Sequence, residues 1–124
     1  MPNFYAAWIG IFLGLCAGAI EGLFFHEDLW RGGYSSWRRR MVRLGHISFF
    51  GIGFINLAYV LSLDYLVISC PYRLPSFLLI IGAAAMPAVC YLAAWRKFFR
   101  HLFFIPAGSV ILGVAIFVYL EILR

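Results

Sequence analysis

The chain has 124 residues, of which 65% are hydrophobic and only 12% are charged, with a formal net charge of +5. A soluble domain carries roughly a quarter charged residues. A small soluble domain also has a high ratio of surface to volume, so it cannot bury so many apolar residues. The apolar content also excludes a disordered chain, and three cysteines, an odd number, argue against a disulfide scaffold. The composition therefore predicts an integral membrane protein.

Four apolar stretches are long enough to cross a membrane as helices, which takes about 20 residues each. They cover residues 4–25, 44–66, 76–95 and 102–123, and the short connections between them leave no room for a soluble domain. The second helix is expected to begin before the membrane, because Ser35 or Ser36 can cap it after the Gly32–Gly33 break. We expect one all-α domain over residues 1–124, an up-down-up-down four-helix bundle in the membrane.

The basic residues are concentrated in two of the connections. Residues 26–43 contain five arginines and residues 96–101 contain three cations, whereas the second connection has only Arg73 and the termini only Arg124. The positive-inside rule places the two basic connections in the cytoplasm and both termini outside it. Because these cations flank membrane spans, they indicate topology and attraction to anionic lipid at the cytoplasmic face, and they give no support to nucleic-acid binding. We expect a bacterial cytoplasmic (inner) membrane protein.

The first stretch carries a glycine at every fourth position: Gly10, Gly14, Gly18 and Gly22. Residues four apart share one face of a helix, so these glycines form a smooth stripe. Helices in lipid associate by close packing, which small residues allow. The stripe predicts a tight helix–helix contact, either inside the bundle or with a partner chain. A flat surface for a planar cofactor is the alternative.

A haem b site is one hypothesis for the polar residues. His46 opens the second stretch and His101 opens the fourth, and the predicted topology places both at the same membrane face. Neutral imidazole is a good axial ligand of haem iron, and bundles hold ligands on facing helices. Arg43 and Arg100 are close in sequence to these histidines and can bind the propionates through charge-assisted hydrogen bonds.

A quinone or proton-handling site is the second hypothesis, and it uses Glu21, His26 and His46. Ionisable residues inside a span are costly and are functional candidates by default, and acid–imidazole pairs can relay protons. The alternative interpretation of Glu21 is a structural hydrogen bond to Arg43 or His46. Asn56 is interpreted as a polar contact between helices.

The sequence contains no pattern typical of an enzyme. It has no phosphate-binding loop, nucleophile elbow or paired catalytic carboxylates, and the spacing of Cys16, Cys70 and Cys90 suits neither zinc nor an iron–sulfur cluster. We therefore expect a small non-enzymatic subunit of a larger bacterial-type membrane complex, of the electron-transfer or photosynthetic kind, with other membrane subunits as partners. The alternative is a membrane electron carrier that binds haem b or a quinone through His46 and His101.

Overall fold

The structure, a computed structural model, describes residues 1–68 and 72–123 and is all-helical there. Its helices are α1 (Pro2–Gly22), α2 (Trp37–Tyr65), α3 (Arg73–Trp95) and α4 (Phe104–Ile122), with short 3₁₀ segments η1 (Trp30–Gly32) and η2 (Lys97–Leu102) before α2 and α4. Four helical segments, the last formed by η2 together with α4, are long and apolar enough to cross a membrane. The prediction of four membrane-length helices is confirmed.

The helix boundaries differ from the predicted spans at several ends. α2 begins at Trp37 because the Ser36 side chain caps it, accepting a hydrogen bond from the Arg39 backbone at 3.2 Å. The expected serine cap at the start of this helix is therefore confirmed. α1 ends at Gly22, earlier than residue 25, where the backbone enters a series of turns. α3 begins earlier than residue 76 because Pro75, which has no N–H to donate, is tolerated in the first turn.

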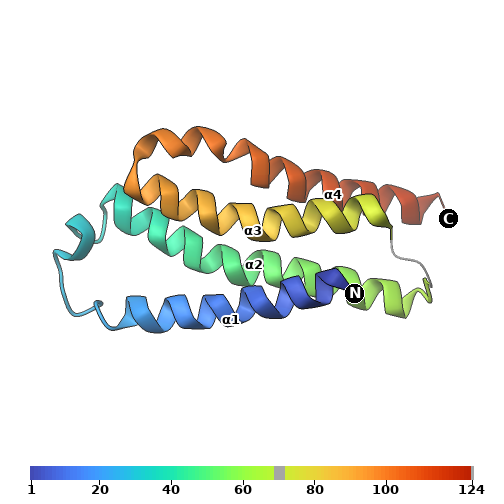
Figure 1. The fold of residues 1–124 in the computed structure, drawn as a ribbon, viewed down its shortest axis with the longest axis horizontal. Helices are drawn as coiled ribbons and strands as arrows, with labels where there is room; N and C mark the ends of the chain where they lie inside the picture. The colour runs from blue at the N-terminus through green and yellow to red at the C-terminus, as the bar shows by residue number, and fades with distance from the viewer. Residues whose placement is uncertain (69–71, 124) are drawn as a thin grey trace.

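The four helices lie side by side in chain order, and both chain ends lie at the same end of the molecule (Figure 1). α2 and α3 are central and pack on each other, α1 packs mainly on α2, and α4 packs on α3. A smaller contact joins α1 to α3. The flanking helices are consequently less buried: 17% of the most apolar 18 residues in each, against 33% for α2 and 39% for α3.

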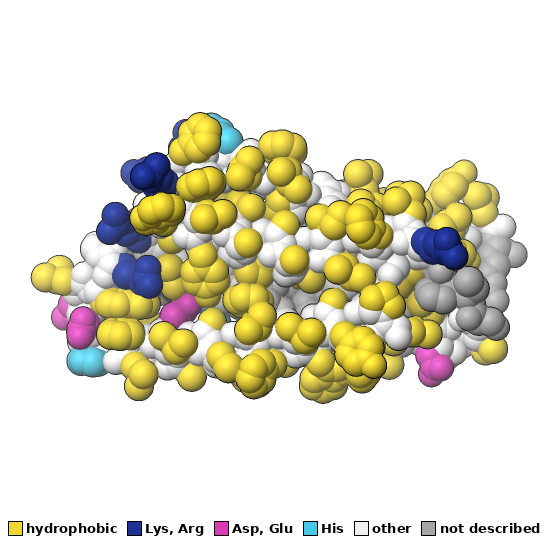
Figure 2. Space-filling view, in the orientation of Figure 1, with side chains coloured by type: hydrophobic (Ala, Val, Ile, Leu, Met, Phe, Trp, Pro, Cys, Tyr) yellow, Lys and Arg dark blue, Asp and Glu magenta, His cyan; other side chains and the backbone are white. Residues whose placement is uncertain are grey.

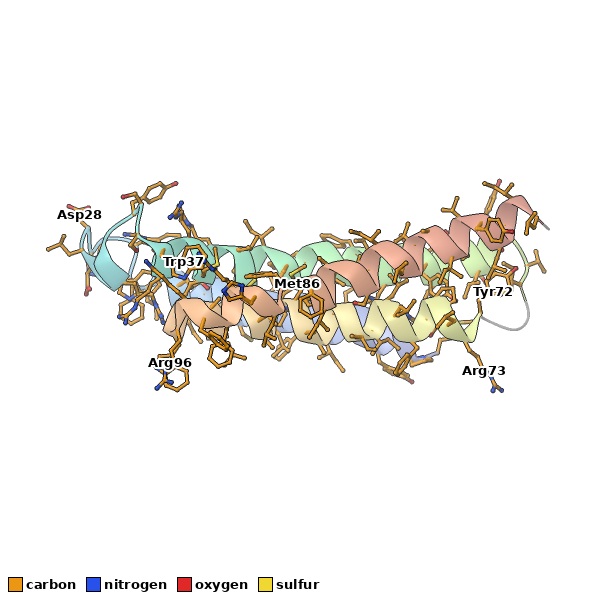
Figure 3. All side chains as sticks on the ribbon, turned by 90° about the horizontal axis from the view of Figure 1, so that it is seen from above. Asp28, Trp37, Tyr72, Arg73, Met86 and Arg96 are labelled. Carbon is orange, nitrogen blue, oxygen red and sulfur yellow. The ribbon has the colours of Figure 1, made fainter. Side chains whose placement is uncertain are left out.

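The cations of the two basic connections gather in space at one end of the molecule (Figure 2). Figure 3 shows Asp28, Trp37 and Arg96 at that end, and Tyr72 and Arg73 at the other. We call the first of these the basic end. The exposed surface between the two ends is largely apolar in the view of Figure 2, as expected for a chain surrounded by lipid.

Three glycines of the stripe lie against α2: Gly10, Gly14 and Gly18. A Cβ at Gly14 would lie 2.8 Å from Cε2 of Phe50, and one at Gly18 would lie 2.5 Å from Cε1 of His46. At Gly22, apart from its chain neighbours and the backbone of its own helix, no atom of the described residues lies within 4 Å of such a Cβ. The three glycines are thus used in a contact within the chain, and Gly22 takes no part in it.

A buried polar network joins α1, α2 and α3 toward the opposite end. Asn3 Nδ2 donates to Asn56 Oδ1 at 2.8 Å and to the Ser76 carbonyl at 3.1 Å, and the Ser76 hydroxyl donates to Asn3 Oδ1. Asn56 Nδ2 donates to the Leu79 carbonyl at 3.2 Å. The interpretation of Asn56 as a polar contact between helices is confirmed, and Asn3 is its partner on α1.

Candidate functional site

Glu21 is a buried carboxylate on the last turn of α1, with only 6% of the residue exposed. The Tyr91 hydroxyl of α3 donates a hydrogen bond to Glu21 Oε1 at 3.3 Å. Glu21 also interacts electrostatically with His46 of α2 and with Arg31 of η1. Three other segments of the chain, α2, α3 and η1, therefore place polar or charged side chains around one carboxylate of α1 near the basic end.

Two adjoining cavities extend from this carboxylate between α1 and α3. The first has a volume of about 450 Å³ and includes Glu21 and Arg31 in its lining. The second has a volume of about 340 Å³ and is lined by apolar side chains and Tyr91. Leu13, Phe49 and Tyr91 line both cavities, so the two are neighbours. We call them together the α1–α3 groove.

Small residues keep the groove open. The second cavity is lined by Ala6 of α1 and by Ala83, Ala84 and Ala88 of α3, and the first by Ala17 of α1. Where two helices present alanine to each other across a limited contact, their side chains do not fill the space between them. The groove is therefore polar near the basic end and apolar along the rest of its length.

His46 lies beside the site and lines neither cavity. Its ring packs against Gly18 and stands edge-on to Phe50, with the ring centroids 5.3 Å apart. Its Nδ1 is buried and has no hydrogen-bond partner among the described residues. The predicted Glu21–His46 pair is therefore close in space, but no hydrogen bond joins the two side chains.

His26 is far more exposed than the site residues. Its side chain is 76% exposed, and Nε2 lies 3.9 Å from Glu27 Oε1. The structure places it in the turn after α1 and outside the linings of both groove cavities.

The predicted haem ligands have different neighbours. His101 is exposed on η2, with its ring centroid 6.0 Å from that of Phe98, whereas His46 packs against α1. η2 packs on α3 and α4. The described residues therefore do not bring His46 and His101 together.

The two arginines predicted to bind the haem propionates, Arg43 and Arg100, have different surroundings and do not form one site. Arg43 donates to the Tyr34 carbonyl at 3.1 Å, and its guanidinium lies 4.1 Å from the centre of the Tyr34 ring. Arg100 is exposed on η2. The geometry gives no support to a haem held between these four residues.

Sequence reasoning missed Tyr91 and assigned Arg31 only to topology. A signal for Tyr91 was present, because it is the one hydroxyl-bearing side chain in the otherwise small and apolar segment 82–94. Among the described residues, no group of three or more His, Cys, Asp and Glu side chains is arranged to hold a metal ion. Cys16 is exposed and Cys90 is buried, whereas Cys70 lies outside the described residues.

No protein-family model, curated protein or solved structure matches the chain. The function is therefore inferred from the geometry of the site itself.

Proposed function

We propose that this protein binds an isoprenoid quinone in the α1–α3 groove, as a small non-enzymatic subunit of a larger electron-transfer or photosynthetic complex in a bacterial cytoplasmic membrane. The observation that carries the proposal is the buried Glu21–Tyr91 pair at the polar end of an otherwise apolar groove. An ionisable side chain inside a membrane helix is costly, and such residues mark ligand or proton sites.

The groove matches the two parts of a quinone. The ring of a quinone forms hydrogen bonds, and its isoprenoid tail is apolar. Glu21 supplies a carboxylate that accepts a hydrogen bond from a quinol hydroxyl, and Arg31 supplies N–H donors for a quinone carbonyl. The apolar second cavity provides room for part of the tail. The haem alternative has less support, because no histidine lines either cavity.

The subunit role is supported by the exposure of the flanking helices. α1 and α4 bury a much smaller share of their apolar residues than α2 and α3 do, so their outer faces are available to lipid or to another membrane subunit. The three glycines that contact α2 are already used within the chain, so a partner would dock on another face of α1 or on α4. The orientation with both termini outside the cytoplasm belongs to the same proposal.

Quinone retention tests the proposal with a matched pair of variants on α1. Ala17 lines the groove, whereas Ala19 is exposed on the same helix and lines neither cavity. Ala17→Leu fills the groove beside Glu21 and should lower quinone retention by about tenfold, equivalent to about 1.4 kcal/mol of binding free energy. Ala19→Leu should leave retention unchanged. The measurement is solvent extraction and mass spectrometry of quinones from protein purified in mild detergent from native membranes.

Two results would contradict the quinone proposal: wild-type protein that carries no quinone, or equal retention in the two variants. A Soret band in the purified protein would instead support the haem alternative. The subunit role is tested separately by native electrophoresis of the solubilised membrane. If the protein migrates alone at the size of one chain, the subunit role is wrong whatever the quinone result.

A further inference from the structure

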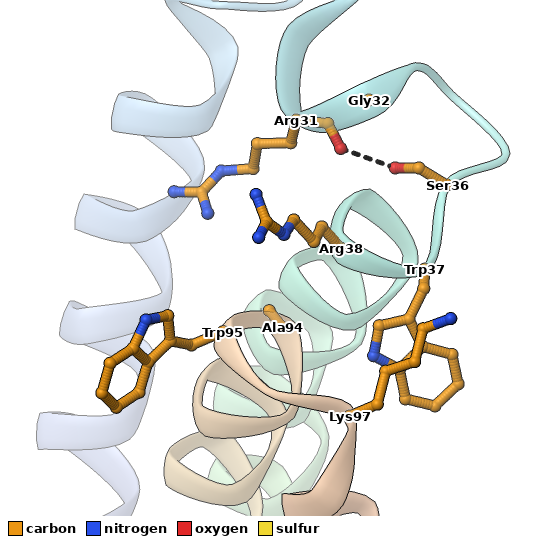
Figure 4. A pocket seen from close by; sticks show the side chains of 8 residues that line it. All are labelled: Arg31, Gly32, Ser36, Trp37, Arg38, Ala94, Trp95 and Lys97. Carbon is orange, nitrogen blue, oxygen red and sulfur yellow. Dashed lines mark hydrogen bonds between the residues drawn. The ribbon is translucent and has the colours of Figure 1, made fainter.

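A separate cavity of about 430 Å³ opens at the basic end between α2 and the end of α3. Its lining includes three cations from three segments: Arg31 of η1, Arg38 in the first turn of α2, and Lys97 of η2. Figure 4 shows the guanidinium groups of Arg31 and Arg38 extending toward each other, with no acidic side chain among the lining residues. We call this space the basic cavity.

The walls of the basic cavity are held by specific contacts. Trp37 Nε1 donates to the Ala93 carbonyl at 2.8 Å, which ties the start of α2 to the end of α3. The Ser36 hydroxyl donates to the Arg31 carbonyl at 2.8 Å. Arg31 has a φ of 55°, a left-handed conformation that costs a residue other than glycine roughly 1–2 kcal/mol. The chain thus keeps a strained arginine at this cavity and fixes it with a side-chain hydrogen bond.

Two of the three cations, Arg38 and Lys97, are not engaged by other side chains of the described residues. Arg39 and Arg43, which do not line this cavity, donate to backbone carbonyls and stack on aromatic rings. The side chains of Arg38 and Lys97, in contrast, form no hydrogen bond, ion pair or ring contact with the residues that the structure describes. Cations that share a cavity repel one another unless an anion joins them.

We propose that the basic cavity binds the phosphate of an anionic phospholipid. Charged hydrogen bonds from Arg and Lys are the strong contacts for phosphate, and the N-terminus of α2 adds a partial positive charge beside it. Trp37 and Trp95 line the cavity, and tryptophan is enriched where headgroups lie. Phospholipid is present at that depth around any membrane protein, so the headgroup is the occupant to which we commit, and free phosphate is an outcome of the test.

The inference stands apart from quinone binding, because it can be tested without altering the groove. Arg38 and Lys97 line only the basic cavity, whereas Arg31 also lines the first groove cavity and is left unchanged. The test variant is therefore Arg38→Gln with Lys97→Gln. Its control is Arg40→Gln with Arg100→Gln, which removes the same charge from two exposed residues outside the cavity lining.

The experiment reconstitutes each protein in nanodiscs of phosphatidylcholine that contain about 10% phosphatidylglycerol. The attraction of anionic lipid to each surface cation is worth roughly 1 kcal/mol. Native mass spectrometry then counts the phosphatidylglycerol that stays bound after release. Wild type and the control variant should each retain one molecule. Neutralising two cations, worth roughly fivefold each, should weaken retention about 25-fold in the test variant. Arg38→Lys should retain the lipid, because it keeps the charge.

Three results would overturn the proposal. An equal loss in test and control variants would mean attraction to the overall surface charge and no specific site. Displacement of the lipid by millimolar inorganic phosphate would mean a site for a soluble anion. Loss of the helical circular dichroism spectrum in the test variant, with lipid retained by Arg38→Ala and Lys97→Ala singly, would mean that the two cations support the fold. Quinone retention is unchanged by the test variant if both proposals hold, so either can fail alone.

Discussion

At the scale of single residues, the absence of a side chain at Gly18 determines where His46 points. The imidazole occupies the space that a side chain at position 18 would fill, so it packs against α1. The expectation of a haem ligand at His46 depended on its facing the start of α4. Sequence indicates that His46 lies near the start of an apolar stretch, but the rotation of α2 that directs the ring toward α1 depends on packing.

The glycine contact gives a prediction at this scale. Gly14→Leu should destabilise the fold by at least about 1–3 kcal/mol, the range for overpacking a well-packed core, because a Cβ there already meets Phe50 at 2.8 Å. Gly22→Leu is the control and should change stability by no more than about 0.5 kcal/mol, since its surroundings are open. The measurement is the unfolding midpoint in detergent. Equal stability of the two variants would mean that α1 does not pack on α2 through this face.

At the scale of elements, the Asn3–Asn56–Ser76 network determines how α1, α2 and α3 meet. Asn3 and Asn56 are 2% and 0% exposed, so water cannot replace their hydrogen bonds. Each helix contributes one polar side chain, and each side chain bonds to a neighbouring helix. The network therefore fixes the relative depth of three helices whose other contacts are largely apolar.

Asn56→Leu should destabilise the protein by about 1–2 kcal/mol, because it removes the bonds to Asn3 and to the Leu79 carbonyl and leaves their polar atoms buried. Ser35→Ala, at an exposed position between η1 and α2, is the control and should have no measurable effect. Thermal unfolding in detergent measures both. A more stable Asn56→Leu protein would show that the network costs stability and that apolar packing alone holds these helices.

At the scale of the whole molecule, the positions of the cations agree with the arrangement of the four helices. The cations of both basic connections lie at one end of the structure, as the positions of the connections between four spans predicted (Figure 2). This agreement is independent of which side of the membrane that end faces. The cytoplasmic assignment rests on the positive-inside rule.

Labelling of engineered cysteines tests that orientation. Ser35→Cys, combined with Cys70→Ser, places a thiol at an exposed position of the basic end. A membrane-impermeant maleimide should label it in inside-out vesicles and leave it unlabelled in intact spheroplasts. The native Cys70, which lies outside the described residues, should show the reverse pattern. Labelling of the Ser35→Cys protein from outside would invert the proposed topology.

The sequence predicted the parts of this protein that depend on local pattern. The lengths of the apolar stretches located four helices, and the serine cap located the start of α2. The candidate site was predicted only through Glu21 and its proximity to His46. Tyr91 and the groove were not predicted, because they depend on how α1 and α3 are rotated and on the space left between small residues. Such tertiary packing has no periodic signature in the chain.

The packing between helices that are consecutive in the chain has a consequence for biogenesis. α2 packs on α1, α3 on α2 and α4 on α3, so each helix after the first finds a large packing surface on the helix synthesised just before it. Most interhelical contacts therefore have low contact order, which favours rapid folding. We expect the helices to assemble in sequence as they leave the translocon, with α4 the last to dock.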